Sequence, residues 1–141
     1  MTDQSAPPAA PQPASIASAA EDKVLPAVVY ALYLIGFATG VTVLIGLILA
    51  YANQGSAGQR MATHYQFQIR TFWVGLAWAL IGGALIAVGL PLSLVLIGLP
   101  IVWFGGAILA LLGFWYAARC ILGLVFVSRG EAYPRPRTWL I

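Results

Sequence analysis

Hydrophobic residues occupy most positions from residue 24 to residue 127, and polar residues interrupt them at only a few places. The longest uncharged stretch runs from Thr71 to Ala118 and holds no Asp, Glu, Lys, Arg or His. About 20 consecutive apolar residues are enough for one membrane-spanning helix, so this stretch has room for two. The sequence Gly89-Leu90-Pro91 divides it, because Gly and Pro together favour the end of a helix. The pattern therefore predicts spans over about residues 66–90 and 94–119.

The first hydrophobic segment, residues 24–52, is longer than one span requires. As a straight helix it would measure ~43 Å, against a hydrocarbon core of ~30 Å. Gly36 and Gly40 lie near its middle, where they permit either a close packing face or a break between two half-helices. We predict one kinked span here, with a re-entrant hairpin of two half-helices as the alternative.

The two ends of the chain lack the pattern of a span. Residues 1–22 are rich in Ala, Pro and Ser and cannot bury enough apolar surface to offset the entropy of ordering, so we predict a disordered tail. Residues 120–141 combine a short apolar run with prolines, arginines and aromatic residues, as in an interfacial segment. The sequence thus predicts an all-α, polytopic membrane protein with about three transmembrane helices in one domain, residues 24–141.

Composition agrees with a membrane protein, because 61% of the residues are hydrophobic and only 8% are charged, against about 25% charged in an average soluble chain. The net charge of +3 is small and the cations lie next to apolar segments, so we expect the lipid bilayer as a partner and no nucleic acid. With three spans, the six arginines fall on the C-terminal side and Lys23 alone on the other. The positive-inside rule then predicts an outside N-terminus and a cytoplasmic C-terminus.

Small residues recur at helical spacing within the predicted spans. They let helix backbones approach closely where lipid offers no hydrophobic drive for association. The second span carries them at strict four-residue spacing and the third has a similar row, so the rows predict helix packing within the chain or with a partner. With the glycines of the first segment, the predicted packing residues are Gly36, Gly40, Gly75, Ala79, Gly83, Ala87, Gly106, Ala110 and Gly113.

The start of the second span has the most unusual local sequence, in which polar and apolar residues alternate from His64 to Trp73. A strand in lipid would leave backbone groups unpaired, so we predict a helix, on which His64, Gln68 and Thr71 fall within about a 60° arc. We interpret them as a candidate polar cluster that faces the bundle interior and binds a headgroup, an ion or a partner. The alternative is a membrane-entry turn with ordinary interfacial residues. His64 has no second His or nearby carboxylate, so no metal site is predicted.

Arginines near the predicted interface are candidate contacts for lipid headgroups or for a partner protein. Arg119 follows Trp115 by one helical turn, close enough for a cation–π contact. Its Cα–Cβ bond tilts toward the bilayer centre, so we expect it to face protein or lipid phosphate, with an ordinary positive-inside anchor as the alternative. The candidate contacts are Arg70, Arg119, Arg135 and Arg137.

Residues suited to catalysis are scarce. Every acidic residue lies outside the predicted hydrocarbon region, so no carboxylate there can relay protons. Cys120 is the only cysteine, and neither it nor the serines have a recognisable base. We therefore expect no catalytic residues, no cofactor and no enzymatic activity.

Four motifs, taken in order along the chain, resemble those of a known family. They are Ile48-Leu-Ala-Tyr51, then His64-Tyr-Gln-Phe-Gln-Ile-Arg-Thr-Phe-Trp73, then Trp115-Tyr-Ala-Ala-Arg-Cys-Ile-Leu-Gly123, then Gly130-Glu-Ala-Tyr-Pro-Arg-Pro136 with Thr138-Trp139. Over residues 24–141 the chain resembles a family of small bacterial inner-membrane proteins, a domain of unknown function distantly similar to the small membrane subunit of the chloroplast inner-envelope import translocon. The resemblance implies a helical bundle, a multi-pass inner-membrane location and no enzymatic activity.

These observations favour a non-enzymatic membrane protein that works as an oligomer or as an accessory subunit of a membrane complex. Its partner would be a second copy or another membrane protein. The alternative is a channel or transporter component, in which an oligomer surrounds a polar path lined by His64, Gln68 and Thr71.

Overall fold

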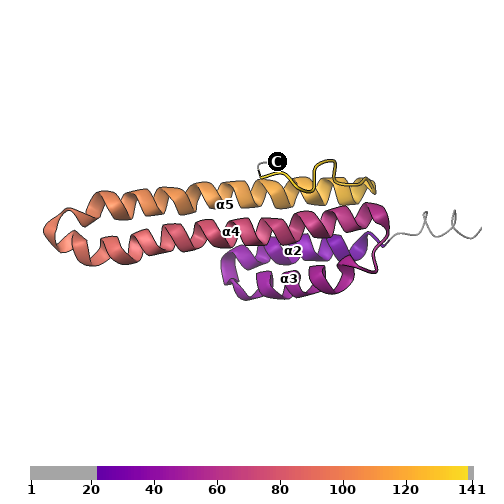
Figure 1. The fold of residues 1–141 in the computed structure, drawn as a ribbon, viewed down its shortest axis with the longest axis horizontal. Coiled ribbons are helices and arrows are strands. Elements are labelled where there is room, and N and C mark those ends of the chain that lie inside the picture. The colour runs from indigo at the N-terminus through magenta and orange to yellow at the C-terminus, as the bar shows by residue number, and fades with distance from the viewer. Residues whose placement is uncertain (1–21, 140–141) are drawn as a thin grey trace, which may run out of the picture.

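The computed structural model describes residues 22–139, and within this range every regular element is a helix (Figure 1). The elements are α2 (Val24–Thr39), α3 (Val41–Gln54), α4 (Gln59–Leu92), the short 3₁₀ turn η1 (Ser93–Val95) and α5 (Gly98–Arg129). The prediction of an all-α fold is therefore confirmed for the described part of the chain. The tail predicted over residues 1–22 lies outside the described residues, apart from Asp22.

The first hydrophobic segment is a helical hairpin. Gly40 ends α2 with a φ of 74°, a conformation that residues with a side chain rarely adopt. The chain reverses there, and α3 returns beside α2 (Figure 1). With 16 and 14 residues the two helices are about 24 Å and 21 Å long, so neither alone would cross a ~30 Å hydrocarbon core. The prediction of one kinked span is wrong, and the alternative of two half-helices is confirmed.

Helices α4 and α5 form a long antiparallel pair joined by η1 (Figure 1). They have 34 and 32 residues, and both are long and apolar enough to cross a membrane. Pro100 is the third residue of α5 and leaves the helix intact, because the first N–H groups of a helix have no intrahelical acceptor. The helix also continues past residue 119 until Gly130, which ends it with a φ of 70°. The interfacial segment predicted over residues 120–141 is therefore helical in its first half.

Glycines at seven-residue spacing bring α4 and α5 together. A Cβ added to Gly105 would lie 2.9 Å from the carbonyl oxygen of Gly82, and Gly89 pairs with Gly98 in the same manner near the turn. Seven residues are about 20° short of two full helical turns, so such a row stays on one face of a helix. This contact is a seam of facing backbones that side chains would force apart.

The predicted four-residue row follows this seam only at its first member, Gly75. Four residues are about 40° more than one turn, so the row rotates steadily away from α5. A Cβ added to Gly83 or Gly106 would have no atom of the described chain within 4 Å, and Ala87 and Ala110 are exposed. Within the described chain these four residues therefore do not pack α4 against α5, and the other alternative, packing with a partner, stays a prediction.

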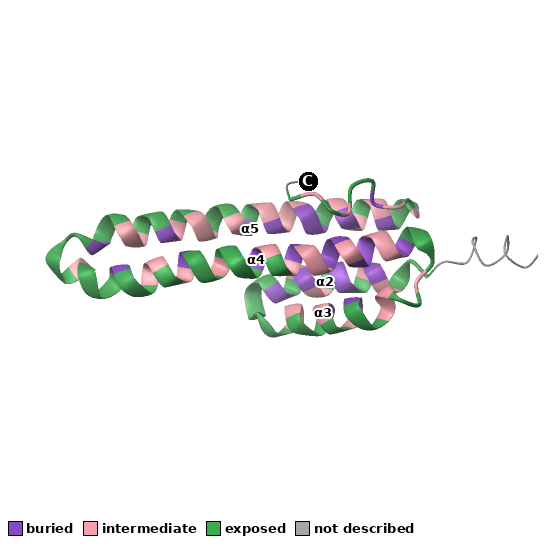
Figure 2. Ribbon diagram, in the orientation of Figure 1, coloured by how far each residue is buried: buried purple, intermediate pink, exposed green. Residues whose placement is uncertain are grey.

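The molecule has two unlike ends. At one end the hairpin packs on the first half of α4 and the second half of α5, and most of the buried residues lie there (Figure 2). At the other end α4 and α5 continue alone through η1 (Figure 1). We call these the four-helix end and the two-helix end.

Candidate functional site

The predicted polar cluster of His64, Gln68 and Thr71 lies buried in the four-helix end, and Arg119 of α5 joins it. None of the four side chains is more than 2% exposed. As the predicted helix requires, His64, Gln68 and Thr71 lie on one face of α4. Helices α2 and α5 pack over that face and cover it. The cluster is therefore enclosed by protein and does not open to solvent.

His64 links α2, α4 and the segment after α5. Its Nε2 lies 2.8 Å from the Glu131 carbonyl oxygen, and because a carbonyl only accepts, Nε2 carries the proton and donates. Nδ1 of the neutral ring then accepts from the Tyr30 hydroxyl at 3.3 Å. Gln68 adds a second link to α2, since its Nε2 donates to the Pro26 carbonyl oxygen at 2.8 Å. Each bond joins residues that are far apart in sequence.

Arg119 joins α5 to α4 and to the C-terminal residues. Its Nε donates to the Thr71 hydroxyl at 3.0 Å, and its Nη1 donates to the Thr138 carbonyl oxygen at 3.2 Å. The Thr71 hydroxyl in turn donates to the Phe67 carbonyl oxygen at 2.7 Å. The guanidinium carbon lies 3.9 Å from the Phe67 ring centroid and 4.7 Å from that of Trp115, so two cation–π contacts flank the charge. Arg119 thus faces protein of its own chain, one of the two surroundings expected for it, and with 1% of its surface exposed it is not a surface contact for headgroups.

Residues 131–139, which we call the C-terminal strap, fold back over the four-helix end (Figure 1). Tyr133 is its anchor: the side chain is 3% exposed and stacks on Phe67 with ring centroids 3.8 Å apart. The Tyr133 N–H donates to the Thr63 hydroxyl at 3.0 Å. Burial raises the pKa of Tyr133, so the phenol stays neutral at physiological pH.

The sequence pattern predicted the cluster but not the residues that close it, above all Tyr30, Phe67 and Tyr133. The Gly130-to-Pro136 motif was a usable signal, because its glycine ends α5 and its tyrosine docks on α4. Nothing local placed Tyr30 beside His64, since their contact depends on the reversal at Gly40.

The four candidate arginines separate into different environments. Arg119 is buried, whereas Arg70 and Arg137 line one groove between α4, the end of α3 and the C-terminal strap. We call it the arginine groove, and its residues are Tyr51, Gln54, Gln66, Ile69, Arg70, Trp73, Pro136 and Arg137. Arg135 is exposed and does not line this groove.

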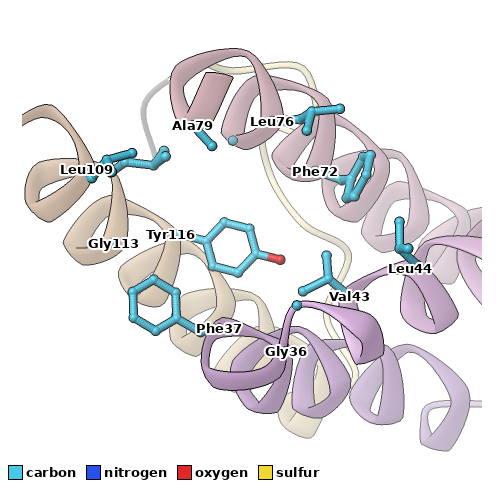
Figure 3. Close-up of a pocket in the computed structure, with 13 residues that line it drawn as sticks. Gly36, Phe37, Val43, Leu44, Phe72, Leu76, Ala79, Leu109, Gly113 and Tyr116 are labelled. Atoms are coloured by element: carbon cyan, nitrogen blue, oxygen red, sulfur yellow. The ribbon is translucent and has the colours of Figure 1, made fainter. Parts of the chain in front are cut away.

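A cleft of about 500 Å³ lies between the hairpin tip and the α4–α5 pair (Figure 3). Small residues line much of it, and five of the predicted packing residues belong to its wall: Gly36, Gly40, Gly75, Ala79 and Gly113. The Tyr116 hydroxyl points into it (Figure 3) and, among residues 22–139, has no hydrogen-bond partner. An apolar segment would fit this space.

Comparison of the chain with protein-family models, with curated proteins and with solved structures finds no match. Within residues 22–139, no group of three or more His, Cys, Asp or Glu side chains is placed to hold a metal ion. The fold and the site define an all-helical protein with two helices that are long and apolar enough to cross a membrane.

Proposed function

We propose that the chain is a multi-pass protein of a bacterial inner membrane, which it crosses with α4 and α5. Both helices exceed a ~30 Å hydrocarbon core, and the hairpin enters the same leaflet without crossing. The resemblance to the family of small bacterial inner-membrane proteins supports the proposed location. With two spans, both ends of the described chain lie on the same side of the membrane.

The orientation follows from the positive charges. All seven Lys and Arg residues lie in or beside the four-helix end, and the α4–α5 turn has none. The positive-inside rule then places both ends of the described chain in the cytoplasm, which replaces the outside N-terminus expected for three spans. Reporter fusions test this: green fluorescent protein after residue 141 should fluoresce, and alkaline phosphatase inserted at Leu96 should be active. Active phosphatase at the C-terminus would contradict the orientation.

We further propose that the protein is a non-enzymatic subunit that assembles with a second copy or with another membrane protein. The observation that carries this proposal is an open face beyond the hairpin tip, made of Gly83, Ala87, Gly106 and Ala110. Gly113 contacts Phe37 of the hairpin, and Gly106 follows on the same side of α5 with no neighbour in the described chain. Glycine inside a helix costs about 1 kcal/mol relative to alanine, and the close approach of another helix would offset that cost.

The cleft at the hairpin tip borders this face and supports the same proposal. Ala79, one turn before Gly83, lines the cleft together with Tyr116. The buried Tyr116 hydroxyl needs an acceptor that no residue of 22–139 supplies. A partner helix lying on the open face would also cover the apolar wall of this cleft.

Assembly is tested by measuring the mass of the intact complex after gentle extraction from the membrane. The wild-type protein should be heavier than one chain, and Gly83→Leu with Gly106→Leu should shift it toward the monomer. The matched control is Ala77→Leu with Ala107→Leu, which adds side chains at exposed positions about 100° or more around each helix. A wild-type protein that is a strict monomer and crosslinks to no partner in cells would refute the assembly proposal.

The alternative of a solute path through His64, Gln68 and Thr71 gains no support from the geometry. These side chains are enclosed, and they donate to or accept from groups of the same chain. A path lined by them would have to break the links that hold the hairpin and the strap. We therefore do not include it in the proposed function.

A further inference from the structure

The arginine groove holds two cations, Arg70 and Arg137, that face no anion within the described chain. Within residues 22–139, the guanidinium of neither Arg70 nor Arg137 has a hydrogen bond or an ion pair. The Nε of Arg70 is buried, and its guanidinium carbon lies 4.7 Å from the Trp139 ring centroid. The ring contact orients Arg70, whose Nη groups, unlike its buried Nε, can still donate to an anion. The groove is thus prepared for an anion.

The depth of the groove matches the boundary between headgroups and acyl chains. Arg70 is the last cation before the uncharged stretch that begins at Thr71. Beside it, the Trp73 indole N–H donates to the Tyr51 hydroxyl at 3.0 Å, and both side chains are exposed. Exposed tryptophan and tyrosine at this position are typical of the membrane–water interface.

A second, apolar groove lies next to the arginine groove, toward the two-helix end. Val74 and Trp78 follow Arg70 at four-residue spacing on the same face of α4, and Trp139 contacts both Arg70 and this groove. We call it the tryptophan groove, and its residues are Val74, Trp78, Ile108, Leu111, Leu112, Trp115 and Trp139. It offers almost no polar surface, and it runs between α4 and α5 on the side away from the hairpin.

We propose that these two grooves together bind one anionic phospholipid, with its phosphate between Arg70 and Arg137 and an acyl chain in the tryptophan groove. Two arginines match a phosphate through bidentate hydrogen bonds. A headgroup that retains a negative charge is preferred, because a zwitterionic headgroup already neutralises its phosphate. The neighbouring apolar groove, whose Trp139 contacts Arg70, distinguishes a phospholipid from a free phosphate ion, which would gain nothing from it.

Native mass spectrometry of the delipidated full-length protein tests the proposal. The probes are phosphatidylglycerol and phosphatidylcholine with identical acyl chains. The wild-type protein should bind the first of these roughly tenfold more tightly, since each arginine near an anionic headgroup contributes severalfold to affinity. Arg70→Gln with Arg137→Gln should abolish the preference. Arg129→Gln with Arg135→Gln removes the same charge from exposed positions outside the groove and should keep it.

Three outcomes would overturn the proposal. One is a wild-type protein that binds both lipids equally well. Another is a control variant that loses the preference for phosphatidylglycerol as fully as the groove variant, which would show that anionic lipid is attracted by the overall positive charge. The third outcome concerns the variant Val74→Phe. This substitution fills the tryptophan groove without changing the charge, and we expect it to weaken the binding of both lipids. If this variant binds phosphatidylglycerol normally and inorganic phosphate alone binds with the same dependence on Arg70, the site is for a free phosphate. If the double variant does not fold, the single variant Arg137→Gln, on the exposed part of the strap, takes its place in the test. Its affinity for phosphatidylglycerol should fall about threefold.

Discussion

The four-helix end and the two-helix end are held together by different interactions. In the four-helix end, buried polar and aromatic side chains join helices that are distant in sequence, as in the bonds from Arg119 to Thr71 and to Thr138. In the two-helix end, facing glycines let two backbones approach, and few side chains are buried. One chain thus uses directional bonds to set a unique arrangement at one end and close backbone packing at the other.

The largest effect should come from removing the cation of the four-helix end. Arg119→Leu loses two hydrogen bonds and two ring contacts. We expect the free energy of unfolding in detergent to fall by about 3 kcal/mol, because hydrogen bonds to charged groups contribute about 1.5–3 kcal/mol each. Arg129→Leu, at the exposed end of α5, should change it by less than about 0.5 kcal/mol. Equal losses in both variants would mean that Arg119 acts only as a surface charge.

Two adjacent glycines test the two-helix end. Gly105→Leu places its Cβ against the Gly82 backbone and should cost about 2 kcal/mol by overpacking. Gly106→Leu meets no atom of the described chain and should leave the stability of the monomer unchanged or slightly higher. Thermal unfolding of the monomer in detergent compares them. A larger loss for Gly106→Leu would contradict the seven-residue seam.

A smaller and more local effect is expected for the strap. His64→Leu leaves the Tyr30 hydroxyl and the Glu131 carbonyl oxygen without their partner, which should cost about 1.5 kcal/mol. Because the Glu131 bond holds the start of the strap, trypsin should cleave after Arg137 faster than in the wild type. Gln59→Leu, at the exposed first residue of α4, is the control and should leave the cleavage rate unchanged.

The smallest effect concerns the backbone reversal in the hairpin. Gly40→Ala forces a side chain into a φ of 74° and should cost about 1 kcal/mol, although a Cβ there meets no atom within 4 Å. Gly55→Ala is the matched control, because its Cβ is equally free and its φ is −80°. Chemical denaturation of both variants separates the effect of conformation from that of contact. Equal stability of the two would show that Gly40 is not needed to reverse the chain.

Hydrophobic patterning was enough to predict the class of the fold and part of the candidate site. Long apolar stretches identified the regions of α4 and α5, and the 3.6-residue period placed His64, Gln68 and Thr71 on one face of a helix. The small-residue rows were a weaker guide. Glycines recur at both four-residue and seven-residue spacing, and only the contact with α5 selects Gly82 and Gly89 over Gly83.

Local sequence patterns were sufficient to predict the helices, their apolar character and the faces on which polar residues gather, because these depend on residues within one or two turns. The reversal at Gly40, the seam at every seventh residue and the strap over the cluster became visible only in the folded chain. The reason is the sequence separation of the contacts. His64 and Glu131 are 67 residues apart, and Thr71 and Arg119 are 48 apart, so no local pattern could pair them.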